Sequence, residues 1–205
     1  MSKTLAAVVA LGLTGCTAVE GDTLSETAFE LKAKKVLQEH PELKPTYKAT
    51  KKYRDVERAL EDGYELGNSS DDFPQTVVNL CVKNPDPNVG AMGFHFFDVA
   101  AYEDPAIDLS HPEVLVYESC VDDENDDDQG CFNGYRLVAV EWVVKKETWE
   151  AAGNTAPPEL SELPHEAHFH ILNTMLNWYL LHAWIYKDNP AGIYADFNPT
   201  VTCPP

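Results

Sequence analysis

The side chains best suited to metal or acid–base chemistry in this sequence are a glutamate and several histidines set among apolar residues. His95 is flanked by phenylalanines, Glu141 by a valine and a tryptophan, and His182 by leucine and alanine. Neutral imidazoles with a carboxylate are ligands that zinc, copper and non-haem iron prefer. Because an unpartnered buried polar group is costly, we expect the three side chains to meet. They predict a site for a divalent transition metal or a small ligand, with His170 as a further ligand.

A second interpretation of these residues needs no ion. A glutamate–histidine pair inside the core would satisfy both groups, and a lone imidazole on an aromatic face is more often a core residue than a ligand. The protein would then be a structural or interaction module, with exposed aromatic side chains near Trp178 and Trp184 docking a partner. A metal-dependent enzyme of unassigned reaction is a third alternative.

The remaining histidine cluster excludes some familiar enzymes. His165-Glu166-Ala167-His168 is one residue short of the HExxH motif, so its spacing does not support a zinc protease. His168 and His170 would lie on one side of a strand, as in cupin-like sites, but the acidic residue that should follow is missing. The sequence also contains no GxSxG elbow, phosphate loop or dinucleotide fingerprint.

An acidic run between Cys120 and Cys131 offers oxygen ligands at alternate positions. This spacing is similar to that of calcium loops, but the central glycine and closing glutamate of an EF-hand are missing. We favour a solvated acidic hairpin tip over a calcium site. The candidate calcium ligands are Asp122, Glu124, Asp126 and Asp128.

The first residues have the features of an export signal. A lysine precedes the apolar run 5–13, and Leu13-Thr14-Gly15-Cys16 resembles the lipobox of bacterial lipoproteins. The resemblance implies that residues 1–15 are removed and that Cys16 carries lipid, followed by a tether over 16–23. Several acyl chains would anchor the protein firmly in a membrane. Thr17, rather than aspartate, favours the outer membrane, so we expect a protein of the cell envelope.

Net charge limits the partners. Removing residues 1–15 leaves 14 Lys and Arg against 34 Asp and Glu, a formal charge of −20. Such a surface disfavours nucleic acid and anionic lipid. The expected membrane contact is therefore the N-terminal lipid, and the sequence identifies no protein partner.

Residues 24–64 predict a helical segment. Thr23-Leu-Ser-Glu26 has capping-box spacing and predicts a helix to about Glu39, which His40-Pro41 would stop. A second helix is expected over 45–62, followed by Gly63 as the left-handed C′ residue and with its basic side chains in solvent. Its expected buried stripe is Ala49, Tyr53, Val56 and Leu60.

Residues 65–205 predict a mixed part of the same domain. Strands are expected within 91–98, 112–119, 135–145 and 178–186, with a hairpin between the second and third and a short helix over 146–153. Alternation places Leu137, Ala139, Glu141 and Val143 on one face, and Trp178, Leu180, His182, Trp184 and Tyr186 on another. We expect an α+β fold: N-terminal helices packed on a small antiparallel sheet.

Four cysteines remain once Cys16 is assigned to lipid, and an exported protein would pair them. Of the three pairings, we expect Cys120–Cys131, which closes the hairpin tip, and Cys81–Cys203, which ties the C-terminus to the start of the sheet.

Several of these segments together resemble a family of exported bacterial proteins of unknown function. The last block, with two Asn-Pro steps, is the most specific. The resemblance implies that Cys81–Cys203 is shared and that His95, Glu141 and His182 are polar core positions of the family, with His170 a further match. Ala91 in place of glycine and the acidic loop depart from the pattern, and the family brings no known activity. The matching segments are Tyr53–Tyr64, Cys81, Ala91–Phe96, Pro112–Glu118, Leu137–Trp142 and Leu181–Cys203.

Overall fold

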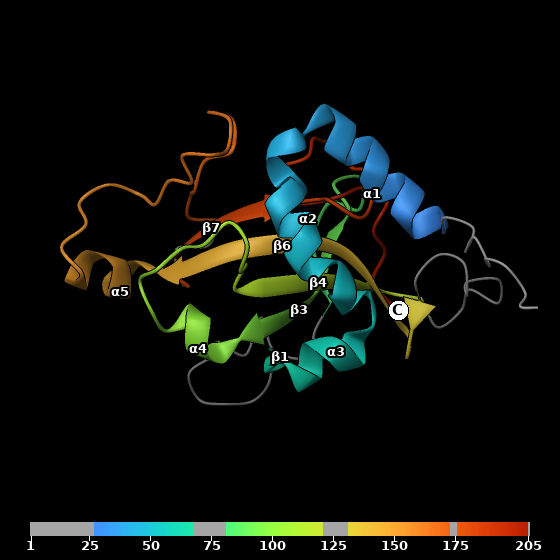
Figure 1. Cartoon of the computed structure of the whole chain (residues 1–205), viewed down its shortest axis with the longest axis horizontal. Coiled ribbons are helices and arrows are strands. Elements are labelled where there is room, and N and C mark those ends of the chain that lie inside the picture. Colours follow the sequence, from blue (N-terminus) through green and yellow to red (C-terminus); the bar gives the residue numbers. More distant parts are fainter. Residues whose placement is uncertain (1–26, 68–80, 121–130, 173–175, 205) are drawn as a thin grey trace, which may run out of the picture.

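The computed structural model of the chain describes residues 27–67, 81–120, 131–172 and 176–204. Within these residues a seven-stranded, entirely antiparallel sheet has the order β1-β3-β4-β6-β5, with β2 added to β3 and β7 to β6 (Figure 1). The strands are β1 (Tyr64–Leu66), β2 (Val82–Lys83), β3 (Ala91–Asp98), β4 (Val114–Ser119), β5 (Cys131–Phe132), β6 (Tyr135–Lys145) and β7 (Trp178–Ala183). The helices are α1 (Ala28–Glu39), α2 (Lys44–Thr50), α3 (Val56–Glu61), α4 (Val99–Tyr102) and α5 (Lys146–Ala151), with 3-10 turns at Pro41–Leu43 and Lys51–Arg54.

The α+β class, the antiparallel sheet and the four expected strands are confirmed, as is the pairing of β4 with β6. The prediction that residues 178–186 form one strand is wrong at its end. β7 stops at Ala183, and the chain turns there, because the Ile185 amide donates to the Ala183 carbonyl. Tyr186 therefore packs on the opposite face of the sheet from Leu180 and Trp184, with which it was predicted to share a face.

The helical part differs from the prediction in two ways. The capping box that begins α1 is formed by Thr27 and Glu30, whose side chains each accept from the other's backbone amide. The predicted capping residues 23–26 lie outside the described residues. Besides the expected helix after β6, a further helix that was not predicted, α4, follows β3. The short helix expected near 146 is confirmed as α5.

The expected second helix is broken into α2, a 3-10 turn and α3. Asp55 takes an extended backbone conformation and its side chain accepts from the Glu57 amide, so it begins a new helix rather than continuing the old one. The break shifts the buried stripe: Ala59 is fully buried, whereas Leu60 is 45% exposed. Gly63 does have the predicted positive φ, at 95°.

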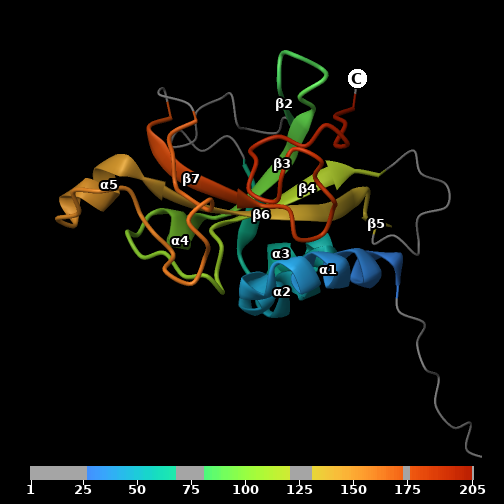
Figure 2. The ribbon, with the colours of Figure 1, turned by 90° about the horizontal axis from the view of Figure 1, so that it is seen from above.

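Two buried clusters occupy the two faces of the sheet. The larger cluster combines residues of α1–α3 with one sheet face, for example Phe29 and Val56 with Tyr117 and Leu181. Figure 2 shows these helices together on one side of the strands. The smaller cluster contains Val116, Ala139 and Trp184, and the C-terminal segment covers it. Leu137 belongs to the larger cluster and Ala139 to the smaller one, so the two do not share a face as predicted. The reason is that the β4–β6 register shifts between Val116 and Tyr117.

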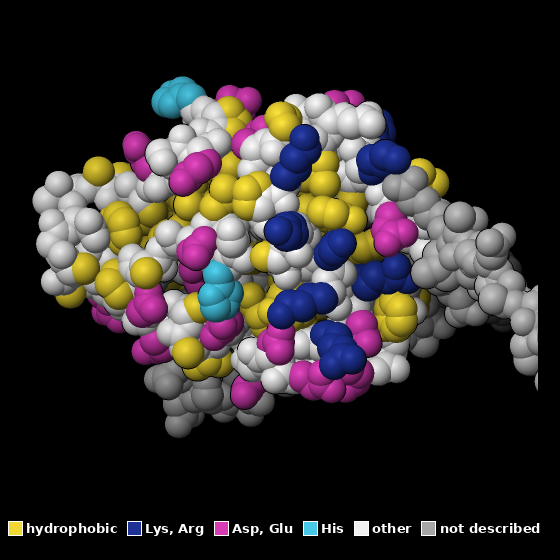
Figure 3. Space-filling model, in the orientation of Figure 1, with side chains coloured by type: hydrophobic (Ala, Val, Ile, Leu, Met, Phe, Trp, Pro, Cys, Tyr) yellow, Lys and Arg dark blue, Asp and Glu magenta, His cyan; other side chains and the backbone are white. Residues whose placement is uncertain are grey.

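Both expected disulfides are present, Cys81–Cys203 and Cys120–Cys131. Nine of the fifteen Lys and Arg residues lie between Lys32 and Arg58. Figure 3 shows basic side chains gathered over the helices, as expected for a solvated helical surface. No helix among the described residues is both long and apolar enough to cross a bilayer.

Candidate metal centre

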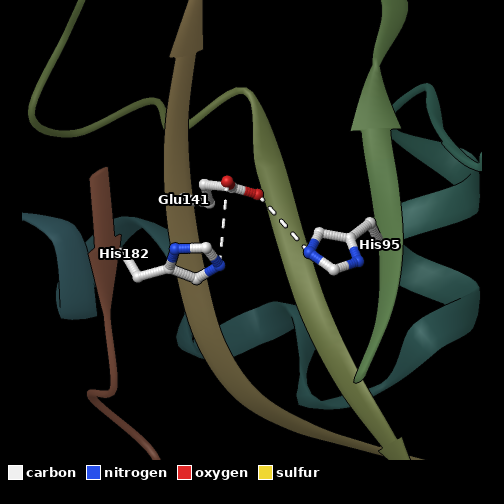
Figure 4. A group of neighbouring side chains, drawn as sticks. All are labelled: His95, Glu141 and His182. Atoms are coloured by element: carbon white, nitrogen blue, oxygen red, sulfur yellow. Dashed lines mark ion pairs between the residues drawn. The ribbon is translucent and has the colours of Figure 1, made fainter. Parts of the chain in front are cut away.

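Three strands place His95, Glu141 and His182 on the same face of the sheet. Glu141 of β6 is the direct cross-strand partner of His182 on β7. His95 of β3 is one strand further away: it pairs with Val116 of β4, which in turn pairs with Ala139, two residues before Glu141. Because residues two apart on a strand share a face, the three side chains converge, as Figure 4 shows.

The distances at this point are those of neighbouring ligands rather than of hydrogen bonds. His95 Nε2 lies 3.6 Å from Glu141 Oε2, and His182 Nε2 lies 3.7 Å from Glu141 Oε1. One candidate ligand atom from each residue lies within 4.8 Å of the other two. Nitrogen–oxygen hydrogen bonds are about 2.7–3.2 Å long. By contrast, ligand atoms bonded at about 2.0–2.1 Å to a tetrahedral zinc ion are about 3.3–3.4 Å apart. The two glutamate–histidine distances are within a few tenths of an ångström of this spacing, and the two imidazoles would have to move closer together to share one ion.

The cluster is sealed from solvent. The side chains of His95 and Glu141 are 5% exposed and that of His182 is 0% exposed. Among the described residues, His95 Nδ1 and both ring nitrogens of His182 are buried without a hydrogen-bond partner. Native interiors contain few such atoms, so three within one cluster require an explanation.

Burial also sets the protonation of these groups. It raises the pKa of Glu141 above its usual range. It lowers the pKa of His95 to about 3, assisted by the neighbouring His182, so the His95 imidazole is neutral at physiological pH and one of its ring nitrogens has a lone pair available. Burial opposes protonation of His182 as well, but the carboxylates of Glu141 and Asp196 outweigh it and raise that pKa.

Asp196 is the residue that sequence reasoning missed. Its Oδ1 lies 3.6 Å from His182 Nδ1, on the side of the ring away from Glu141. His170, expected as a further ligand, lies outside the group and contacts Asp196 instead, with Nε2 3.0–3.1 Å from the two carboxylate oxygens. Burial would raise the pKa of Asp196, but His170 and His182 hold it well below its usual range. No local pattern marks Asp196, because its partners are distant in the chain.

The other candidate residues do not join the site. His165, Glu166 and His168 are exposed. The proposed calcium ligands 122–128 and the proposed lipidation site at 16 lie outside the described residues. Trp178 and Trp184, near which exposed aromatic side chains were expected to dock a partner, are themselves only 7% and 0% exposed. Trp184 instead stacks on the His182 ring, and its indole N–H donates to the Ala195 carbonyl at 2.6 Å.

Comparisons of this chain with protein-family models, with curated proteins and with solved structures find no match. Membership of the exported family described above therefore stays a prediction.

Proposed function

We propose that this protein binds one divalent transition-metal ion through His95 Nε2, His182 Nε2 and Glu141. The convergence of these three side chains carries the proposal, since they come from three strands and their ligand atoms lie within 4.8 Å of one another. A ligand set of two histidines and one glutamate suits zinc, and also non-haem iron. The neutral state of the His95 imidazole favours the same chemistry.

The role we propose for the ion is structural. The three side chains are sealed, so a substrate would have no route to the ion in this conformation. An ion held there would link β3, β6 and β7, and its binding energy would add to the stability of the folded protein. The sealed burial equally favours the alternative that the three residues form a metal-free polar core, and the experiment below separates the two.

The proposed place of action is the cell envelope, with the protein anchored by lipid on Cys16 and facing the periplasm or the cell surface. The lipobox-like Leu13-Thr14-Gly15-Cys16 supports this placement. The two disulfides are compatible with it, because disulfides persist in oxidising compartments.

We also propose that the helical segment 24–64 and residues 65–205 form one domain, with the N-terminal helices packed on the sheet. The mixed composition of the larger core cluster supports this division, since it joins Phe29, Leu37 and Ala59 to Leu115 and Trp142 of the sheet.

Metal analysis of the purified protein tests the proposed site. After incubation with zinc and removal of the excess, the wild-type protein should retain one equivalent of metal, and a His95→Ala/His182→Ala variant should retain none. The matched control is His111→Ala/His168→Ala, which removes two exposed histidines and should retain the full equivalent. Equal metal content in the two double variants would favour the metal-free core.

A further inference from the structure

A second carboxylate lies behind the proposed metal ligands. His95, Glu141, His182, Asp196 and His170 form a continuous series in which each side chain faces the next at 3.0–3.7 Å. Glu141 and Asp196 approach opposite nitrogens of the His182 ring: Glu141 faces Nε2 and Asp196 faces Nδ1. The two carboxylates therefore have different tasks.

Asp196 is held in place from two directions. His170 Nε2 contacts both of its oxygens, at 3.0 and 3.1 Å. The backbone of His170 exchanges two hydrogen bonds, 3.0 and 3.1 Å long, with Leu180, two residues before His182 on β7. On the other side, the carbonyl of the preceding Ala195 accepts the Trp184 indole N–H. The carboxylate is thus fixed relative to the strand that carries the His182 ring.

A carboxylate in this position can orient a histidine that binds a metal. A histidine that binds a metal through Nε2 must carry its proton on Nδ1. A carboxylate that accepts from that N–H fixes the tautomer and the ring orientation and makes the ligand more basic. His182 Nδ1 is buried and has no hydrogen-bond partner among the described residues, and Asp196 Oδ1 is the oxygen that faces it at 3.6 Å.

We propose that Asp196, held by His170, is a positioning residue of the metal centre: it accepts from His182 Nδ1–H and directs Nε2 toward the ion. This inference rests on the proposed metal site. It also gives His170 a different task from the one expected from the sequence, since His170 acts on the centre through Asp196 and not as a ligand.

The experiment measures zinc and cobalt affinity by competition with a chelator, together with the visible absorption of the cobalt-loaded protein. Asp196→Ala should weaken metal binding about 10–100-fold, the loss usual when such a partner is removed, and should change the cobalt spectrum. Asp196→Asn keeps the shape but not the charge and should give a smaller loss in the same direction. His170→Gln should weaken binding less than Asp196→Ala, because Asp196 remains.

Asp98→Asn is the matched control. Asp98 forms the same kind of pair, with Oδ2 2.9 Å from His111 Nε2, but it is not part of the series. Asparagine can also still cap α4, as Asp98 does through the amides of Ala100 and Ala101. Its affinity and cobalt spectrum should match those of the wild type.

The outcomes separate this inference from the proposal beneath it. Wild-type affinity and spectrum in Asp196→Ala would overturn the positioning role and leave the metal site standing. A wild-type protein that binds neither zinc nor cobalt would overturn both. If Asp196→Ala does not fold, the isosteric Asp196→Asn decides: unchanged affinity and spectrum would overturn the role, and weaker binding with an altered spectrum would support it.

Discussion

The two faces of the sheet bury polar groups in different ways. On the face covered by α1–α3, hydroxyls have close partners. Thr46 donates to the Leu109 carbonyl at 2.7 Å, and Tyr117 donates to the Tyr53 carbonyl at 2.6 Å. Thr50 and Tyr186 share a further hydrogen bond of 2.7 Å. This face follows the general rule that a buried polar group is hydrogen-bonded.

The opposite face breaks that rule where His95, Glu141 and His182 meet. The contacts between them are 3.6–3.7 Å long, and three ring nitrogens have no hydrogen-bond partner among the described residues. Leaving a buried donor or acceptor unpaired costs about 1–3 kcal/mol for each group. Since both faces belong to one sheet, poor packing of the fold as a whole does not explain the difference. The proposed ion at His182 Nε2, together with Asp196 as acceptor for Nδ1–H, would account for both His182 nitrogens.

The largest expected effect concerns Glu113, a buried carboxyl that has one close hydrogen-bond donor. It is as buried as Glu141, but its carboxyl accepts a hydrogen bond from the Val143 amide at 3.0 Å. Burial nevertheless raises the pKa of Glu113 to about 8. The folded protein thus keeps a proton that the unfolded chain releases near its ordinary pKa of 4.5, so stability is highest below that value and falls as the pH rises toward 8.

Glu113→Gln should remove this part of the pH dependence. At about 1.36 kcal/mol for each pKa unit, the wild-type protein loses on the order of 4 kcal/mol across this range through Glu113. Chemical unfolding at several pH values between 4.5 and 8.5 measures the slope. Glu141→Gln is the comparison, because the raised pKa of Glu141 contributes a slope of the same sign. An undiminished slope in Glu113→Gln would show that this carboxyl is ionised in the folded protein.

Tyr117→Phe tests the sheet face covered by α1–α3, where buried hydroxyls are hydrogen-bonded. Removing the hydroxyl leaves the buried Tyr53 carbonyl without its donor, and we expect a loss of about 1–3 kcal/mol in the free energy of unfolding. Tyr135→Phe is a matched control: its ring lies 6.2 Å from that of Tyr117, and its hydroxyl makes no hydrogen bond to the described residues. Equal losses in the two variants would mean that the hydrogen bond of Tyr117 contributes nothing.

Alternation within strands was enough to predict much of the site. It placed Glu141 and His182 among apolar residues on one strand face, because a side-chain period of two survives wherever a strand is regular. The cost of burying unpartnered polar groups then predicted that they meet His95. Alternation failed at Leu137, where a register shift moves the side chain to the other face. Whether a strand contains such an irregularity depends on its neighbour, which a single strand's sequence does not encode.

The predictions for the second helix and for Asp196 failed for two other reasons. Asp55 competes for the backbone through its side chain and breaks a helix that apolar spacing alone would continue. Asp196 lies in an irregular segment after β7, and only the folded chain brings it to His182 and to His170, 26 residues away. Periodicity gives no information about a side chain on a loop.

His95→Leu tests the unsatisfied face and should have the smallest effect on stability. Leucine has nearly the volume of histidine and carries no polar atom, so in metal-free protein it removes a buried group that has no hydrogen bond at Nδ1. We expect the free energy of unfolding in the presence of chelator to change by less than about 1 kcal/mol, which is less than the loss in Tyr117→Phe. Added zinc should then stabilise the wild type but not this variant, because a ligand is gone. A loss as large as that of Tyr117→Phe in chelator would mean that His95 already has a strong partner without any ion, and the contrast between the two faces would disappear.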